Sequence, residues 1–281
     1  MRLANLDGRA VILTRDDAGF DVHAASGGDF GPDLPAIYTR WTEFVAWATT
    51  ASGTEVAIDP ARLDSPSPRP TQVFAIGLNY TEHADESGFD RPDRLPPVFT
   101  KWQSAITGPV TTVALPPGGD TDWEVELVAI IGREAKDLPD GAGWDAVAGL
   151  AVGQDLSERI TQMEGPAPQF GLGKSFPGFA PIGPWLVTPD AVPDRDDLEI
   201  WAQIDGEDVQ RGRTGQLIFP VPRLVEALSR IVTLLPGDVV FTGTPSGVGF
   251  ARKPPRLLQA GETLLSGIEG LGTLRQTFVA G

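Results

Sequence analysis

The chain has 281 residues, of which 41% are hydrophobic and 21% are charged, a balance typical of soluble globular proteins that bury a full core. Its formal net charge of −16 and its pI of about 4.4 argue against nucleic-acid and anionic-membrane partners. It contains no cysteine, which excludes disulfides, a thiol nucleophile and zinc–thiolate sites. No apolar leader begins the chain, and no apolar run approaches the roughly 20 residues of a membrane-spanning helix, so we expect a cytoplasmic protein.

The first part of the chain, residues 1–70, predicts a small α+β domain. Residues 10–13 predict a short strand, and residues 41–48 have the apolar spacing of a helix. A connector rich in proline and serine follows at residues 59–70. We interpret this connector as the boundary with a second domain of residues 71–281.

The second domain is predicted to consist mainly of β-strands, because 33 glycines and 26 prolines favour turns and short strands over long helices. Apolar strands between turns are expected at residues 73–77, 124–132, 185–187, 198–204 and 238–242. One helix is expected at residues 222–233, and its predicted buried stripe consists of Leu224, Val225, Leu228, Ile231 and Val232. The absence of an alternating βαβ pattern argues against a doubly wound parallel sheet.

Two glutamates lie inside one apolar, strand-like run, Trp123-Glu124-Val125-Glu126-Leu127-Val128. Residues i and i+2 of a β-strand point to the same face, so Glu124 and Glu126 would lie side by side. Asp155 closes another apolar stretch later in the chain. A solvated strand face explains the glutamate pair taken alone, because glutamate is mostly exposed. A divalent cation held by the three carboxylates is the alternative, because buried like charges repel one another.

His83 and Glu86 are three residues apart, so they would share one face of a helical turn. A carboxylate partner orients an imidazole and raises its basicity, which suits a general base that acts on water. A chance pair on a surface helix is the alternative. His23, the other histidine, lies in a turn-rich segment without such a partner and is assigned no role.

Seven sequence blocks, in this order, resemble the fumarylacetoacetate hydrolase superfamily. They are GLNYTEHADE from residue 77, FTKWQSAITGP from 99, DWEVEL from 122, VGQDLSER from 152, GKSF from 173, PIGPW from 181 and PGDVVFTGTPSGVG from 236. The resemblance implies a mixed α/β, predominantly β fold. In this fold a rolled β-sandwich catalytic domain follows a small N-terminal α+β domain.

The resemblance implies that Glu124, Glu126 and Asp155 bind a divalent cation. Ligation by oxygen alone favours Mg²⁺, with Mn²⁺ or Ca²⁺ as substitutes. The usual substrates of the family are small anionic 2-oxo acids or diketones that supply two oxygens to the metal. Members of the family are commonly homodimers, so we expect a homodimer here.

The resemblance also implies roles for four further polar residues. Lys174 would lie beside the metal and act on the developing oxyanion, although a surface lysine on a glycine-rich loop is the alternative. Arg159 would face the substrate, although it could instead serve only as an ion-pair partner of Asp155 or Glu158. The residues expected to donate hydrogen bonds to the substrate are Gln162 and Thr244.

Departures from the family pattern affect the expected substrate. Pro177 interrupts the block after the lysine, and Gln154 stands where an asparagine is expected before the aspartate. Arg211 and Arg213, in the loop before the predicted helix, could extend toward an anionic substrate.

The resulting hypothesis is a metal-dependent hydrolase that cleaves a C–C bond in acylpyruvates or related β-diketo acids. His83 and Glu86 would activate water, and the metal would stabilise the leaving enolate. An isomerase, decarboxylase or tautomerase of a 2-oxo acid, such as oxaloacetate or a hydroxy-dienedioate, is the alternative at the same site, because enolate stabilisation serves all of these reactions. A non-catalytic binding protein is the third hypothesis.

Overall fold

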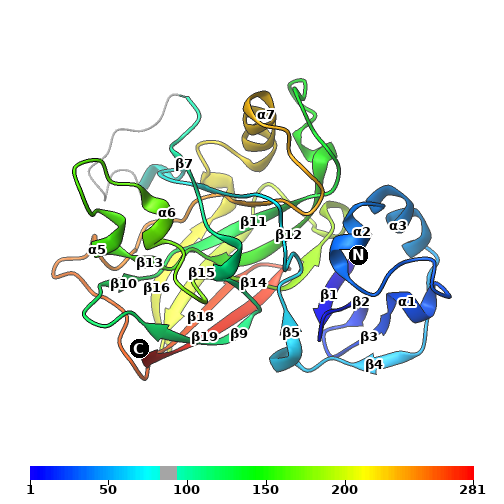
Figure 1. The fold of residues 1–281 in the computed structure, drawn as a ribbon, viewed down its shortest axis with the longest axis horizontal. Coiled ribbons are helices and arrows are strands. Elements are labelled where there is room, and N and C mark those ends of the chain that lie inside the picture. Colours follow the sequence, from blue (N-terminus) through cyan, green and yellow to red (C-terminus); the bar gives the residue numbers. More distant parts are fainter. Residues whose placement is uncertain (83–93) are drawn as a thin grey trace.

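The computed structural model describes residues 1–82 and 94–281, and strands dominate both ranges (Figure 1). The largest sheet has 12 strands in the order β4 (Glu55–Ala57), β3 (Ala18–Asp21), β2 (Arg9–Arg15), β1 (Arg2–Leu6), β14 (Ala180–Val187), β12 (Val147–Gln154), β11 (Val125–Ile131), β17 (Val239–Phe241), β6 (Val73–Ile76) and β7 (Val98–Thr100), with β5 (Leu63–Asp64) paired to β1 and β8 (Ile106–Thr107) paired to β14. The second sheet has five strands in the order β16 (Glu207–Arg213), β15 (Glu199–Ile204), β18 (Thr263–Ile268), β19 (Gly272–Ala280) and β9 (Val110–Leu115). A two-stranded ribbon consists of β10 (Thr121–Asp122) and β13 (Ser157–Glu158). The helices are α1 (Val22–Ala25), α2 (Leu34–Tyr38), α3 (Trp41–Ala48), α5 (Arg159–Gln162), α6 (Phe170–Gly173) and α7 (Val221–Ile231). The expected mixed α/β, predominantly β fold is confirmed.

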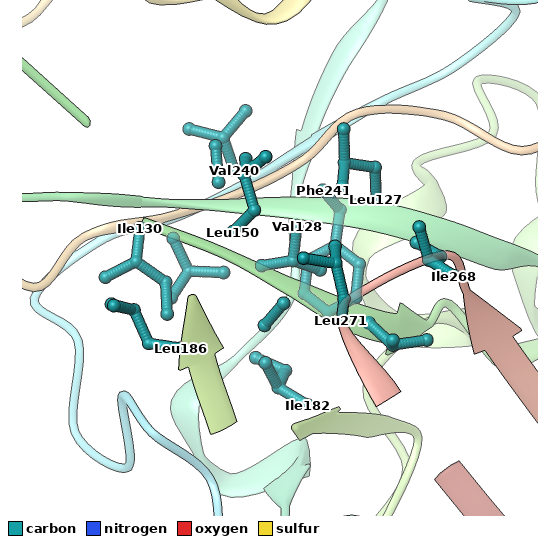
Figure 2. Packing of buried hydrophobic residues seen from close by; sticks show 14 of the residues in the cluster. Leu127, Val128, Ile130, Leu150, Ile182, Leu186, Val240, Phe241, Ile268 and Leu271 are labelled. Carbon is teal, nitrogen blue, oxygen red and sulfur yellow. The ribbon is translucent and has the colours of Figure 1, made fainter. Parts of the chain in front are cut away.

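The main core lies where the two large sheets pack together around β11 and β12. Every residue of these two strands is buried, which explains why their sequences are nearly continuous apolar runs rather than alternating patterns. Strand β12 contacts β18 and β19 of the second sheet. Figure 2 shows Leu127 and Leu150 of the first sheet and Ile268 of the second sheet in this cluster. Polar side chains on β11 are therefore held on a rigid support.

Most elements expected from the sequence are present, with bounds that differ by at most two residues. The main difference is β14, which begins at Ala180 although a strand was expected only from residue 185. This part of β14 contains Pro181 and Pro184, and proline cannot donate to a sheet ladder. The first residues of β14 pair with the short strand β8, and the ladder with β12 shifts register between Leu150 and Val152, so the prolines are accommodated.

The predicted buried stripe of α7 is wrong at its end. Leu224, Val225 and Leu228 are buried, whereas Ile231 is 70% exposed. The backbone of Val232 is already extended, so the helix ends at Ile231, and the half-buried Val232 packs against the core from outside the helix.

The N-terminal strands extend the large sheet instead of forming a separate one. Strand β1 pairs with β2 on one side and with β14 on the other, where Leu3 lies opposite Leu186. Helices α1, α2 and α3 gather with β1–β4 at one end of the molecule (Figure 1). The division into two domains near residue 70 stays a prediction. No helix in the described ranges is long and apolar enough to cross a lipid bilayer.

Candidate active site

Three carboxylates meet at one end of the β11–β12 pair. Glu126 lies in β11, Glu124 directly precedes this strand, and Asp155 directly follows β12. The register places Glu126 opposite Gly153, and the backbone N–H of Asp155 donates to the carbonyl oxygen of Glu124 at 2.9 Å. One oxygen from each of the three carboxylates lies within 4.8 Å of the others. Glu124 is 6% exposed and Glu126 is 1% exposed, so the alternative of a solvated strand face is wrong.

Two buried lysines neutralise part of this charge. The Nζ of Lys174 donates to Glu124 Oε2 at 2.7 Å and to Asp155 Oδ2 at 2.8 Å. Lys174 is 2% exposed, which rules out the surface lysine considered above. The Nζ of Lys101, which follows β7, donates to Asp155 Oδ1 and to the backbone carbonyl oxygen of Lys174. No role was predicted for Lys101 from the sequence. Its position in the FTKWQSAITGP block was the only sequence feature that could have indicated one.

Arg159 joins the cluster through the carboxylates of Asp122 and Glu124. Its Nη2 donates to Asp122 Oδ2 and to Glu124 Oε1, both at 2.7 Å. The alternative of an ion pair with Asp155 or Glu158 is therefore wrong. The carboxylate of Glu158 instead accepts from backbone N–H groups at the start of α5, which fixes the helix that begins with Arg159.

Asp122 connects Arg159 to a turn on the other side of the site. Besides the guanidinium, its carboxylate accepts from the backbone N–H groups of Gly249 at 2.7 Å and Phe250 at 3.0 Å. The ring centroid of Phe250 lies 4.5 Å from the Arg159 guanidinium carbon. Asp122 is fully buried and was missed as an individual residue, although the DWEVEL block includes it.

The charges in this cluster are not balanced. Among the described residues it contains four carboxylates (Asp122, Glu124, Glu126 and Asp155) and three cations (Lys101, Arg159 and Lys174), which leaves a formal charge of −1. Burial and the neighbouring carboxylates of Asp155 and Glu124 raise the pKa of Glu126 well above its usual value. Burial opposes the charge on Lys174, but Asp155 and Glu124 outweigh it and raise the pKa of this lysine. Burial lowers the pKa of Lys101 in spite of the attraction of Asp155.

These side chains fit a divalent cation. Three carboxylates provide the hard oxygen ligands that Mg²⁺, Mn²⁺ and Ca²⁺ prefer, and the excess negative charge of this buried cluster is what such an ion would neutralise. The backbone N–H of Gly243 donates to Glu126 Oε2 at 2.8 Å and fixes the orientation of that carboxylate. Gly243 has a φ of 101°, a conformation that favours glycine.

Four members of the cluster line a cavity of about 380 Å³, together with Gln162 and Thr244; they are Glu124, Glu126, Arg159 and Lys174. Gln162 Oε1 accepts from Arg159 Nη1 at 2.9 Å. The Thr244 hydroxyl donates to the carbonyl oxygen of Val125 at 2.9 Å and accepts from Gln210 Nε2 at 2.8 Å. The structure therefore brings Arg159, Gln162, Thr244 and Lys174 to one cavity, while their contacts with a substrate stay predictions.

Other residues singled out from the sequence lie elsewhere. His83 and Glu86 fall outside the described residues. Arg211 and Arg213 do not line the cavity and form exposed ion pairs with acidic residues of the surface, so the expectation that they extend toward a substrate is wrong. Gln154 is buried and bridges two segments, because it accepts from the backbone N–H of Glu124 at 3.0 Å and donates to Ser266 Oγ at 2.6 Å.

Comparison with known proteins gives the same family as the sequence blocks. A model of the family "Fumarylacetoacetate (FAA) hydrolase C-terminal" matches residues 72–279. A "putative hydrolase" of Burkholderia cenocepacia (strain HI2424) is 48% identical over 227 residues, which cover 77% of this chain and 80% of that protein.

Solved structures extend the similarity to the whole chain. The crystal structure of a "putative HpcE protein" from Mycobacterium smegmatis has a TM-score of 0.95 and 54% identity, covering 100% of this chain and 99% of that one. A 5-carboxymethyl-2-hydroxymuconate delta-isomerase from M. smegmatis has a TM-score of 0.78 and 30% identity, covering 100% and 99%. A fumarylpyruvate hydrolase from Pseudomonas aeruginosa, in complex with Mn²⁺ and pyruvate, has a TM-score of 0.67 and 37% identity, covering 75% and 91%. Similar proteins thus include both hydrolases and isomerases.

Proposed function

The chain belongs to the fumarylacetoacetate hydrolase family, and we propose that it is a metal-dependent hydrolase that cleaves a C–C bond of acylpyruvates or related β-diketo acids. The observation that carries this proposal is the buried group of Glu124, Glu126 and Asp155, with the ammonium of Lys174 bonded to two of the three carboxylates. The similar fumarylpyruvate hydrolase solved with Mn²⁺ and pyruvate supports the same chemistry.

The three carboxylates would hold Mg²⁺, or Mn²⁺ in its place. When bound, such a cation supplies Lewis-acid polarisation of the substrate's carbonyl oxygens and stabilises enolate charge.

The protein's own groups would move the proton and bind the charged intermediates. His83, oriented by Glu86, would take a proton from a water molecule, whose oxygen attacks the acyl carbonyl carbon. The bond between this carbon and the adjacent methylene then breaks, and its electron pair becomes the enolate of pyruvate. Protonation of that enolate carbon gives pyruvate, and the acyl group leaves as a carboxylic acid. Lys174 remains charged and stabilises the developing oxyanion.

An isomerase, decarboxylase or tautomerase at the same site is the second candidate. It is favoured by the similarity to the delta-isomerase from M. smegmatis. The two candidates differ in product, because only cleavage of an acylpyruvate releases pyruvate together with a second carboxylic acid.

The test is pyruvate release from acetylpyruvate, fumarylpyruvate and oxaloacetate, each with Mg²⁺, Mn²⁺ or EDTA. We expect metal-dependent release from the two acylpyruvates. We also expect its loss in Glu126→Gln but not in the exposed control Glu134→Gln. Release from oxaloacetate alone would favour the decarboxylase. Wild-type protein that binds neither Mn²⁺ nor any of these acids would contradict both enzymatic candidates.

A further inference from the structure

We infer that the acyl end of the substrate is an uncharged alkyl or aryl group, so that monocarboxylic acylpyruvates are preferred over dicarboxylic ones. This inference deepens the proposed function and rests on it. It concerns the walls of the cavity rather than the charged cluster at its side.

The walls of the cavity are apolar and come from segments far apart in the sequence. The apolar side chains that line it include Leu78, Pro97, Phe99, Met163, Phe170 and Phe250. The rings of Phe99 and Phe170 meet edge to face with centroids 5.6 Å apart, which gives one continuous aromatic wall. Met163 is 55% exposed and Phe250 is 39% exposed, so apolar surface continues outward from the cavity to solvent.

The cations that line the cavity, within the described ranges, are already paired. They are Lys174 and Arg159, and each is bound to two carboxylates. Aromatic rings flank both of them, with Lys174 Nζ 5.2 Å from the centroid of Phe99 and Arg159 covered by Phe250. A second carboxylate on the substrate would therefore lose its hydration against apolar side chains without gaining a cation from the described part of the chain.

One apolar wall residue is held in a costly conformation. Leu78 has a φ of 57°, a left-handed conformation that is rare for a residue with a bulky side chain. The next residue, Asn79, is fully buried, and its side-chain amide donates to the carbonyl oxygens of Phe219 and Thr242 and accepts from the N–H of Phe219. These three hydrogen bonds fix the turn that brings Leu78 to the cavity. Strain maintained in this way at a cavity wall supports a role in ligand contact.

The experiment compares two substrates of equal length, pentanoylpyruvate and glutarylpyruvate, which differ only in a terminal methyl or carboxylate group. Both are measured on the Mn²⁺-loaded wild-type protein. We expect kcat/KM to favour pentanoylpyruvate by at least about tenfold, because the described residues offer the terminal carboxylate no unpaired cation when it is desolvated. If turnover is too slow to measure, calorimetric Kd values for the same two compounds replace the rates. The heat capacity of binding should become more negative from acetylpyruvate to pentanoylpyruvate as more apolar surface is buried.

Matched variants on α6 test the role of the wall itself. Phe170→Arg adds a cation to the cavity wall and should shift the ratio toward glutarylpyruvate by about tenfold or more. Leu172→Arg, on the same helix but 65% exposed and outside the cavity lining, should leave the ratio unchanged. The ratio is measured on a single preparation, so partial unfolding of a variant does not alter it.

The outcomes separate this inference from the function on which it rests. Equal or greater efficiency with glutarylpyruvate would overturn the inference and leave the hydrolase proposal standing. An unchanged ratio in Phe170→Arg would also overturn it. Failure of the metal-loaded protein to bind or cleave either compound would overturn the hydrolase proposal, and the inference with it.

Discussion

Replacing Lys101 by methionine tests whether the cluster depends on a cation that does not itself line the cavity. Lys101 is 1% exposed, and its ammonium bonds to Asp155 and to the backbone carbonyl oxygen of Lys174. Methionine has a similar length and no charge. The substitution therefore removes the ion pair while keeping most of the packing.

The expected effect follows from the surrounding charges. With Lys101 absent, four buried carboxylates would face only Lys174 and Arg159, and the formal charge of the described cluster would change from −1 to −2. Removing one partner of a buried ion pair typically costs about 3–5 kcal/mol. We expect Lys101→Met to lower the free energy of unfolding of the metal-free protein by this amount. Mn²⁺ supplies positive charge to the same carboxylates, so it should reduce the difference in free energy of unfolding between Lys101→Met and wild type.

The assay is urea unfolding of both proteins in EDTA and in saturating Mn²⁺. Lys253→Met is the control, because Lys253 is exposed at the surface, and it should change stability by no more than about 0.5 kcal/mol. Equal stability of Lys101→Met and wild type in EDTA would refute the electrostatic reasoning. A difference that is the same with and without Mn²⁺ would show that the metal does not share this charge cluster.

Three further predictions follow from the site and its supports. Asp122→Asn should raise KM for acetylpyruvate about 10–100-fold while Mn²⁺ affinity by calorimetry stays within about threefold, because one of the two anionic partners of Arg159 is lost and Glu124, Glu126 and Asp155 are unchanged; an unchanged KM would contradict this. Burial acts to raise the pKa of Glu158, but hydrogen bonds from Thr161 and from backbone N–H groups outweigh burial and lower this pKa. The ionised Glu158 therefore stabilises the folded protein at neutral pH, and this contribution is lost as pH falls through the folded-state pKa. Glu158→Gln should therefore cost about 1 kcal/mol in urea unfolding at neutral pH and progressively less below about pH 4, and a pH-independent cost would exclude this linkage. Mn²⁺ at about 100 times its Kd should stabilise the wild-type protein by about 2.7 kcal/mol and should not stabilise Glu126→Gln, whereas equal stabilisation of both would place the metal elsewhere.

The three carboxylates were predictable because their orientation depends on local geometry. The two-residue period of a strand sets Glu124 and Glu126 on one side, and an apolar run leads directly to Asp155. Antiparallel pairing of two adjacent buried strands then brings the ends of those runs together. The first two features are short-range patterns that a sequence displays, whereas the pairing of the two strands is seen only in the structure, and the full ligand set was implied by the family resemblance.

The charge partners were harder to predict because they come from segments joined only in the folded protein. Lys101 follows an edge strand of the large sheet, and Asp122 belongs to the small ribbon of β10 and β13. Neither segment has a periodicity that reveals its neighbours. The exposed Ile231 has a similar explanation, since helical spacing describes a face of the helix but does not show where the helix leaves the core.

The charge of the cluster and the walls of the cavity lead to the same substrate preference by separate arguments. A divalent cation would change the formal charge of the described cluster from −1 to +1. An acylpyruvate with one carboxylate would then bring the described cluster to neutrality, whereas a dicarboxylate would leave one negative charge that the described residues do not compensate. Such a charge is costly where the surrounding side chains are apolar and the lining cations, Lys174 and Arg159, are already paired. Strands β11 and β12 can hold the charged cluster in a buried position because the burial of the apolar core around them offsets the cost of desolvating the cluster.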